Sequence, residues 1–242
     1  METTEIKDKM DLSVILPIKS ASAKRFDELF HASILSLQGQ VVPFEELIIV
    51  HTDETQLVEF LDGYDFSGMN VNRVVWTNEP NFGSQVNFGI ENAKTKWVTV
   101  LEFDDEFSKI WFKNVKKYAE SFPQVQAFLP VVVETNEQGV FAGFTNEATF
   151  AANFSQEIGF LTNDTLQNYQ NFQTAGCVIK KSVIEDFGGF KPSFKLTFIY
   201  EFLLRLTYNS ATLMTIPKIG YKHINLREGS IFWGYKNGTH RI

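Results

Sequence analysis

The chain has 242 residues, of which 44% are hydrophobic, and its 29 acidic and 22 basic residues give a formal net charge of −7. This composition is typical of a folded globular protein and excludes an intrinsically disordered chain, which is poorer in large apolar side chains. The acidic balance argues against broad binding to nucleic acid or to anionic membranes, because phosphate groups attract Lys and Arg.

The N-terminal residues 1–10 are polar, and we expect them to form a flexible tail. They contain no apolar stretch of the kind found in secretory signals, and no run of about 18 apolar residues that would span a bilayer occurs in the chain. The single cysteine, Cys177, cannot form a disulfide within the chain. These features predict a cytoplasmic protein without a transmembrane segment, stabilised by its hydrophobic core.

Strands and helices are expected to alternate through the first hundred residues. Short apolar, β-branched runs predict strands, and apolar side chains at three- and four-residue spacing predict helices. The expected strands are residues 13–16, 44–50, 72–76 and 97–103, and the expected helices are residues 24–37, about 55–61 and the later part of 78–96. This order predicts an α/β fold with a mostly parallel sheet covered by helices on both faces.

The second half of the chain has weaker periodicity. We expect a strand at 125–134, an irregular segment at 135–172, a strand, short helix and Gly-Gly turn within 174–190, a helix at 200–210, a strand at 211–217 and a loop or strand at 220–232. No repeat, linker or low-complexity block divides the chain. We therefore expect one domain over residues 11–242, with functional halves at 11–130 and 131–242.

Acidic side chains follow the fourth expected strand directly. Four carboxylates lie within the five residues from Glu102 to Glu106, and their charges would repel one another at neutral pH. A divalent cation that prefers oxygen ligands, Mg²⁺ or Mn²⁺, would remove this repulsion. Ligands of open α/β sheets bind beyond the carboxyl ends of the strands. The motif therefore predicts a metal site, with a solvated acidic turn as the alternative.

Residues 81–105, NFGSQVNFGIENAKTKWVTVLEFDD, resemble the nucleotide-sugar half of family 2 glycosyltransferases with the GT-A fold. Asn81 and Gly83 match the family's N-x-G loop, and Asn87 matches an Asn of the helix that follows. The residues from Glu102 to Asp105 match the family's acidic pattern. The segments SVILPIKS, ELIIVHTDET and GGFKPSF are similar to three further family motifs, although Lys19 replaces the family's usual Asn. The resemblance implies a Rossmann-like GT-A domain.

The resemblance also implies roles for these residues. Asp104 and Asp105 would hold a divalent metal bound to the donor diphosphate, and Glu102 would lie near the ribose or the metal. Pro17 and Asp53 would contact the nucleoside, with an ordinary helix N-cap as the rival interpretation of Asp53. Asn81, Gly83 and Asn87 would belong to the donor-binding part.

A further pattern of the fold is matched by three C-terminal residues, His223, Arg227 and Ser230. The resemblance implies that His223 completes the metal site and that Arg227 helps to hold the diphosphate. A structural histidine is the alternative for His223.

The catalytic base is the point at which the chain departs from the family. Many members carry Glu-Asp shortly before a helix of the form x-x-L-L-x-R-L, and here Phe198 and Ile199 occupy those positions. Glu201 is the nearest carboxylate, so we expect it to be the general base. The alternative is a surface ion pair between Glu201 and Arg205, which are four residues apart on the helix.

The resemblance thus implies a hexosyltransferase-type glycosyltransferase. It would move a sugar from a UDP- or GDP-sugar to a glycan or other hydroxyl acceptor, assisted by Mn²⁺ or Mg²⁺ and with inversion at the anomeric carbon. Nucleic acid is not an expected partner. Two alternatives remain, a sugar nucleotidyltransferase and a catalytically inactive module that binds nucleotide-sugars or glycans.

Overall fold

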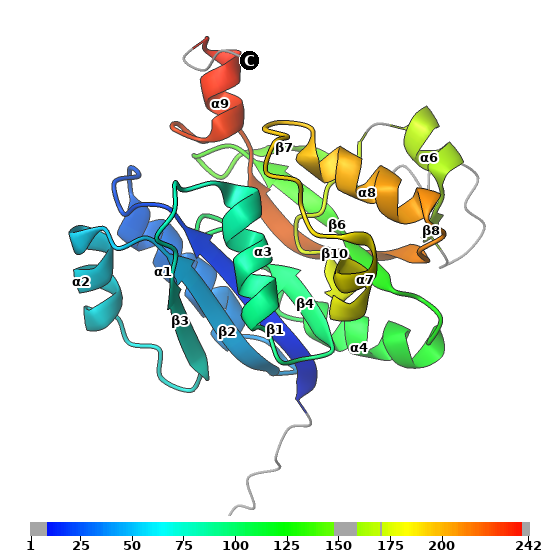
Figure 1. Cartoon of the computed structure of the whole chain (residues 1–242), viewed down its shortest axis with the longest axis horizontal. Helices are drawn as coiled ribbons and strands as arrows, with labels where there is room; N and C mark the ends of the chain where they lie inside the picture. The colour runs from blue at the N-terminus through cyan, green and yellow to red at the C-terminus, as the bar shows by residue number, and fades with distance from the viewer. Residues whose placement is uncertain (1–8, 148–158, 170, 239–242) are drawn as a thin grey trace, which may run out of the picture.

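The computed structural model describes residues 9–147, 159–169 and 171–238. One sheet forms its centre, with strand order β3-β2-β1-β4-β9-β6-β10-β5, and with β7 beside β6 and β8 beside β10 (Figure 1). The strands are β1 Met10–Ile18, β2 Phe44–His51, β3 Val71–Val75, β4 Trp97–Val100, β5 Glu106–Phe107, β6 Ala127–Thr135, β7 Phe141–Thr145, β8 Gly159–Leu161, β9 Val178–Lys180 and β10 Leu213–Ile224. The helices are α1 Phe26–Gln38, α2 Thr55–Gly63, α3 Phe82–Asn92, α4 Trp111–Ser121, α6 Asn163–Asn168, α7 Lys181–Phe187, α8 Phe198–Tyr208 and α9 Ile231–Lys236.

The sheet confirms the expected α/β fold. Strands β3, β2, β1 and β4 are parallel to one another, and β6 is parallel to β10. Strand β9 runs antiparallel to both β4 and β6. The other six strands, β3, β2, β1, β4, β6 and β10, therefore all point in one direction, and β9 runs against them. The carboxyl ends of β4, β6 and β10 therefore meet at one edge of the sheet, where ligands of such folds bind.

Helices cover both faces of the sheet, because the apolar side chains of β1 point to both faces and must be buried on each. Leu12, Val14 and Leu16 of β1 join the core cluster that includes apolar residues of α1, α2 and α4. Ile15, on the opposite face of the strand, joins the cluster beneath α3, α7 and α8. Because side chains alternate along a strand, a nearly continuous apolar run marks a strand buried on both faces. None of the described helices is both long and apolar enough to span a membrane.

Several features of the first half differ from the expectation. Of the expected tail at 1–10, residues 1–8 lie outside the described residues, whereas Met10 is buried in β1. The strand expected at 97–103 is shorter, because β4 ends at Val100 and a turn follows in which the amide of Asp105 bonds the carbonyl of Glu102. No element was expected at 107–122, where α4 buries Trp111, Phe112 and Val115. The apolar residues of α4 recur at helical spacing with lysines between them, so the sequence carries a signal for this helix.

The second half is more regular than its sequence suggests. Segment 135–172 contains β7, β8 and α6, while residues 148–158 and 170 lie outside the described part. The strand expected at 211–217 continues as β10 to Ile224, and its pairing with β6 shifts register between Ile216 and Ile219. This irregularity surrounds Pro217, which has no amide hydrogen to give to the ladder.

Candidate functional site

The acidic motif lies at the carboxyl end of β4, where a side chain of α1 supports it. Ser33 Oγ lies 2.8 Å from the carbonyl oxygen of Asp105 and 3.0 Å from that of Glu102. The tyrosine hydroxyl of Tyr221, on β10, accepts a hydrogen bond of 3.2 Å from the amide of Glu102. These contacts fix the turn that presents the carboxylates.

Asp105 is buried and lies against β10. Its Oδ1 accepts a hydrogen bond of 3.0 Å from the amide of Ile224, and its Oδ2 lies 2.9 Å from Nδ1 of His223. The antiparallel pairing of β5 with β10, in which Tyr221 faces Phe107, brings these distant segments together. The structure therefore places Asp105 and His223, two of the three expected metal ligands, in contact.

Glu102, Asp105 and His223 each offer a ligand atom, and these atoms lie within 4.8 Å of one another. Burial, and next the charge of Asp105, raise the pKa of Glu102 to about 8. Burial alone would lower the pKa of His223, but Asp105 and the other carboxylates raise it to about 10. Negative charge therefore dominates the cluster, and a proton or another cation is needed to balance it.

Asp104, the third expected ligand, has a different partner in the structure. Its carboxylate accepts a hydrogen bond from Nε of Arg227, and both side chains are largely buried. The guanidinium of Arg227 also lies 4.9 Å from the ring centre of Phe103. Burial and the charge of Asp105 raise the pKa of Asp104. Asp104 thus lies beside the three-residue cluster, paired with the cation expected to hold a diphosphate.

The residues present fit the divalent metal that the family implies. Two carboxylates and one imidazole form a donor set that suits Mn²⁺ or Mg²⁺. Burial and the charge of Asp105 disfavour the ionised form of Glu102, and a bound cation would stabilise that form. The candidate ligands whose atoms lie close together are thus Glu102, Asp105 and His223, and Asp104 lies next to this group.

The expected nucleoside residues lie at the ends of β1 and β2. Pro17 is buried in β1 opposite Val50, beyond the residues of β1 that pair with β4. Asp53 is exposed, and it is not the N-cap of α2: that position belongs to Glu54, whose side chain makes no capping bond. The N-cap interpretation of Asp53 is therefore wrong, and its nucleoside contact stays a prediction.

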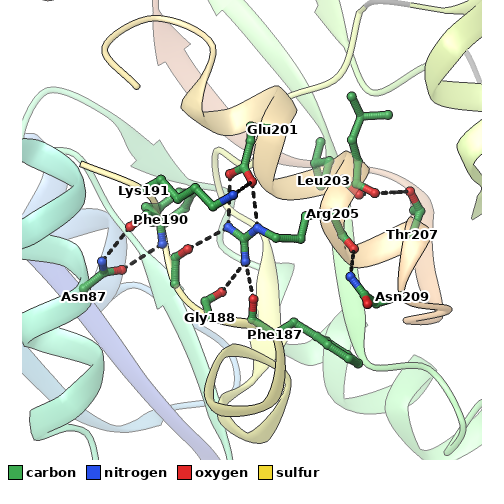
Figure 2. Close-up of polar contacts among 12 residues, drawn as sticks. Asn87, Phe187, Gly188, Phe190, Lys191, Glu201, Leu203, Arg205, Thr207 and Asn209 are labelled. Carbon is green, nitrogen blue, oxygen red and sulfur yellow. Dashed lines mark hydrogen bonds and ion pairs between the residues drawn. The ribbon is translucent and has the colours of Figure 1, made fainter. Parts of the chain in front are cut away.

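Asn81, Gly83 and Asn87 face the Gly-Gly turn. Asn81 caps α3 by accepting a hydrogen bond of 3.1 Å from the amide of Ser84. A Cβ on Gly83 would lie 3.3 Å from Cβ of Phe190, so the glycine permits close packing there. The side chain of Asn87 bonds both backbone groups of Phe190, at 2.7 Å to its carbonyl and 2.9 Å from its amide (Figure 2). In this structure these residues hold the turn, and their donor contacts stay predictions.

Glu201 forms the ion pair that was its alternative interpretation. Its carboxylate accepts bonds of 2.7 and 3.1 Å from Arg205 and lies 2.9 Å from Nζ of Lys191 (Figure 2). The hydrogen bond with Arg205 is the largest cause that lowers the pKa of Glu201. The guanidinium of Arg205 also donates to the carbonyls of Phe187, Gly188 and Gly189. A base role for Glu201 stays a prediction.

The sequence motifs did not mark two supporting residues, Ser33 and Tyr221. Ser33 lies on the buried face of α1 among Phe30, Ile34 and Leu37. A polar residue within an apolar helical stripe is a usable signal, because a buried hydroxyl needs a partner. Tyr221 carries no such signal, since aromatic residues are common in buried strands.

Solved structures of S. aureus TarS have a similar fold. TarS 1-349 in complex with UDP-GlcNAc has a TM-score of 0.73 and 18% identity, over 96% of this chain and 62% of that chain. The complex with UDP has a TM-score of 0.70 and 17% identity, over 89% and 60%. A longer TarS structure gives 0.67 and 18%, over 93% of this chain and 38% of that one. Such low identity shows the fold alone, and the chain spans about 60% of the TarS 1-349 chains.

No curated protein sequence matches the chain significantly. A family model does match, over residues 13–187, and this range contains the N-x-G loop, the acidic motif and all strands from β1 to β9 except for the first residues of β1. With the GT-A-like sheet and the acidic cluster at the end of β4, this match places the chain in glycosyl transferase family 2.

Proposed function

We propose that the chain transfers a sugar from a nucleotide-diphosphate donor to an acceptor hydroxyl, with inversion and with the help of Mn²⁺ or Mg²⁺. The observation that carries this proposal is the group of Glu102, Asp105 and His223 at the carboxyl end of β4. A metal held there would neutralise the diphosphate as it leaves. UDP-GlcNAc is the first donor to test, because TarS was solved with it.

The protein groups around this cluster have separable tasks in the proposal. Asp104 orients Arg227 through their buried ion pair, and Arg227 would then face the diphosphate. Glu201 lines an open groove of about 700 Å³ beside α8, together with Asn163 and Gln167 of α6. This groove supports an acceptor site near Glu201, although the ion pair with Arg205 makes that carboxylate a weaker proton acceptor.

The test is calorimetric titration of UDP and UDP-GlcNAc in Mn²⁺ and in EDTA. We expect binding that needs the metal, and a loss of at least about tenfold in Asp105→Asn. Asp186→Asn is the matched control, because Asp186 is an exposed carboxylate on α7. Equal affinities in Mn²⁺ and EDTA would contradict the metal-assisted function.

One observation favours a second candidate, a module that binds the donor without catalysis. The carboxylate of Glu201 is occupied by Arg205 and Lys191, and apolar residues occupy the positions at which the family carries Glu-Asp. Turnover of UDP-GlcNAc in the presence of Mn²⁺, by hydrolysis or transfer, distinguishes the two. Tight binding of UDP-GlcNAc with no turnover would favour the binding module.

A further inference from the structure

A polar group with no assigned role lies at the carboxyl ends of β6 and β10. It consists of Glu134 on β6, Asn225 after β10 and Gln173 before β9. We propose that these three side chains, named here the amide–carboxylate group, bind hydroxyl groups of a sugar substrate. The inference rests on the proposed glycosyl transfer and adds residues that contact the sugar.

The strand register places this group beside the candidate metal site. Glu134 pairs directly with His223 in the parallel ladder between β6 and β10. Paired residues of neighbouring strands project from the same face of a sheet, and Asn225 follows His223 by two residues. Glu134 and His223 therefore share one face at the edge where ligands of such sheets bind.

Direct contacts orient the carboxylate. Oε1 of Glu134 accepts a hydrogen bond of 3.2 Å from Nε2 of Gln173, and Oε2 accepts one of 2.8 Å from Nδ2 of Asn225. All three side chains are partly exposed. Within the described part of the chain Glu134 forms no ion pair, whereas Glu201 contacts two cations. Among the described residues, Glu134 is thus a hydrogen-bonded carboxylate without a cation at ion-pair distance.

A buried asparagine in an unusual backbone conformation supports the group. Asn146 is fully buried and has φ 64°, in the left-handed region that costs energy for residues other than glycine. Its side chain donates to the carbonyl of Gln173 at 3.1 Å and accepts from the amide of Gln173 at 2.8 Å. It also donates to the carbonyl of Pro130 on β6 at 2.9 Å. Asn146 therefore fixes Gln173 against the strand that carries Glu134.

The hydrogen-bond acceptors that remain unused in the amide–carboxylate group determine which kind of ligand it can bind. Each carboxylate oxygen of Glu134 has one further lone pair, and the amide oxygens of Gln173 and Asn225 receive no hydrogen bond from the described residues. A ligand must therefore supply mainly donors. Phosphate oxygens at neutral pH supply few donors and would be repelled by Glu134. Neighbouring hydroxyls of a sugar supply several, so the group suits the sugar rather than the diphosphate.

The experiment compares Glu134→Gln and Asn225→Ser with wild type and with Glu120→Gln. Glu120 is an exposed carboxylate on α4 and serves as the control. Four quantities are measured in Mn²⁺: affinity for UDP, affinity for UDP-GlcNAc, hydrolysis of UDP-GlcNAc, and transfer to methyl glucoside. Thermal melting confirms that each variant is folded.

If the group binds the donor sugar, Glu134→Gln should weaken UDP-GlcNAc about tenfold or more and leave UDP unchanged, because a hydrogen bond to a charged group is lost. If it binds the acceptor sugar, both affinities and hydrolysis should persist while transfer falls about tenfold or more. Asn225→Ser, which keeps Glu134, should show the same pattern more weakly.

Two results would overturn the inference. Unchanged values for all four quantities in folded Glu134→Gln would show that the group contacts no sugar. Equal weakening of UDP and UDP-GlcNAc would place it at the nucleotide instead. Failure of the wild type to bind either nucleotide would contradict the proposed function itself, so the two failures are distinguishable.

Discussion

Asp105 is surrounded by groups whose charges depend on one another. Its side chain is fully buried, His223 lies 2.9 Å away, and the pKa of Glu102 is raised to about 8 by burial and by the charge of Asp105. Burying a carboxylate is expensive unless it is paired and hydrogen-bonded. Because the carboxylates raise the pKa of His223 to about 10, its protonated form would supply one balancing charge. A divalent ion would supply two and would release the imidazole to act as a ligand.

A substitution of His223 distinguishes between two interpretations of the cluster, a metal site and a buried ion pair. His223→Ala should lower Mn²⁺ affinity about 10–100-fold, the range seen when the surroundings of a bound metal are perturbed. Calorimetric titration of the folded fraction with Mn²⁺ measures this, and Lys222→Ala is the control because Lys222 pairs with Glu106 outside the cluster. An unchanged Mn²⁺ affinity, together with a lower melting temperature, would show that His223 is only packed.

Sequence reasoning found the residues of the site that belong to motifs and missed those that do not. Asp105 and His223, which lie 118 positions apart, were assigned to one site, and the structure puts them in contact. Ser33 was missed although its place in the apolar stripe of α1 was a usable signal. Glu134 was missed because one carboxylate at a strand end becomes informative only when the strand register is known. The rival interpretation of Asp53 as the N-cap of α2 was wrong by one residue, since Glu54 holds that position.

At the scale of elements, the Gly-Gly turn joins three helices. Asn87 of α3 holds the turn from one side, and Arg205 of α8 bonds three successive carbonyls at the end of α7 from the other (Figure 2). A Cβ on Gly189 would lie 2.2 Å from the side-chain oxygen of Asn87, so only glycine fits. The motif residues of this region are therefore explained by packing as well as by substrate binding.

Glu201 completes this arrangement, and its role gives a prediction for stability. Glu201→Gln should lower the free energy of unfolding by roughly 1–3 kcal/mol at pH 7, since it weakens charged hydrogen bonds to Arg205. Because the folded-state pKa of Glu201 is lowered, its contribution is present above about pH 4.5 and is lost as pH falls through the folded-state value. Urea unfolding of wild type and variant at pH 7 and at pH 3.5 measures both effects.

The control for this measurement is Glu185→Gln. Glu185 also forms an i,i+4 pair, with Lys181, but it is exposed, so its loss should cost less than about 0.5 kcal/mol. If Glu201→Gln is as stable as this control at pH 7, the ion pair has no structural importance. A loss of transfer of at least about 100-fold in the same stable variant would support Glu201 as the general base.

Elements with a single clear period were predictable, and elements that depend on tertiary contacts were not. Strand β2 and helix α1 begin within two residues of their expected starts, because β2 contains the apolar run Leu47–Val50 and α1 has apolar residues at helical spacing. Strand β7, of sequence FAGFT, is partly exposed, and its rings Phe141 and Phe144 are in contact. Such an edge strand is specified by pairing with β6 rather than by its own periodicity.

At the scale of the whole molecule, one sheet runs through both expected halves of the chain. Strand β4 belongs to residues 11–130 and β10 to residues 131–242. In the sheet, strands β9 and β6 lie between them. The side chains of Glu102 and Asp105 from the first half meet His223 from the second. A divalent ion held by all three would therefore link the two halves, so metal binding and global stability should be coupled.

This coupling predicts a metal-dependent melting temperature. An ion that binds only the folded chain stabilises it by about 2.7 kcal/mol at a concentration of 100 Kd. For a domain of this size each kcal/mol corresponds to roughly 2–4 °C, so saturating Mn²⁺ should raise Tm by about 5–10 °C relative to EDTA. Asp105→Asn should abolish the shift and Asp186→Asn should keep it. If Tm is the same in Mn²⁺, Mg²⁺ and EDTA, or if the shift persists in Asp105→Asn, the ion does not bind between β4 and β10, and the acidic motif would have to be balanced by His223 and Arg227 alone.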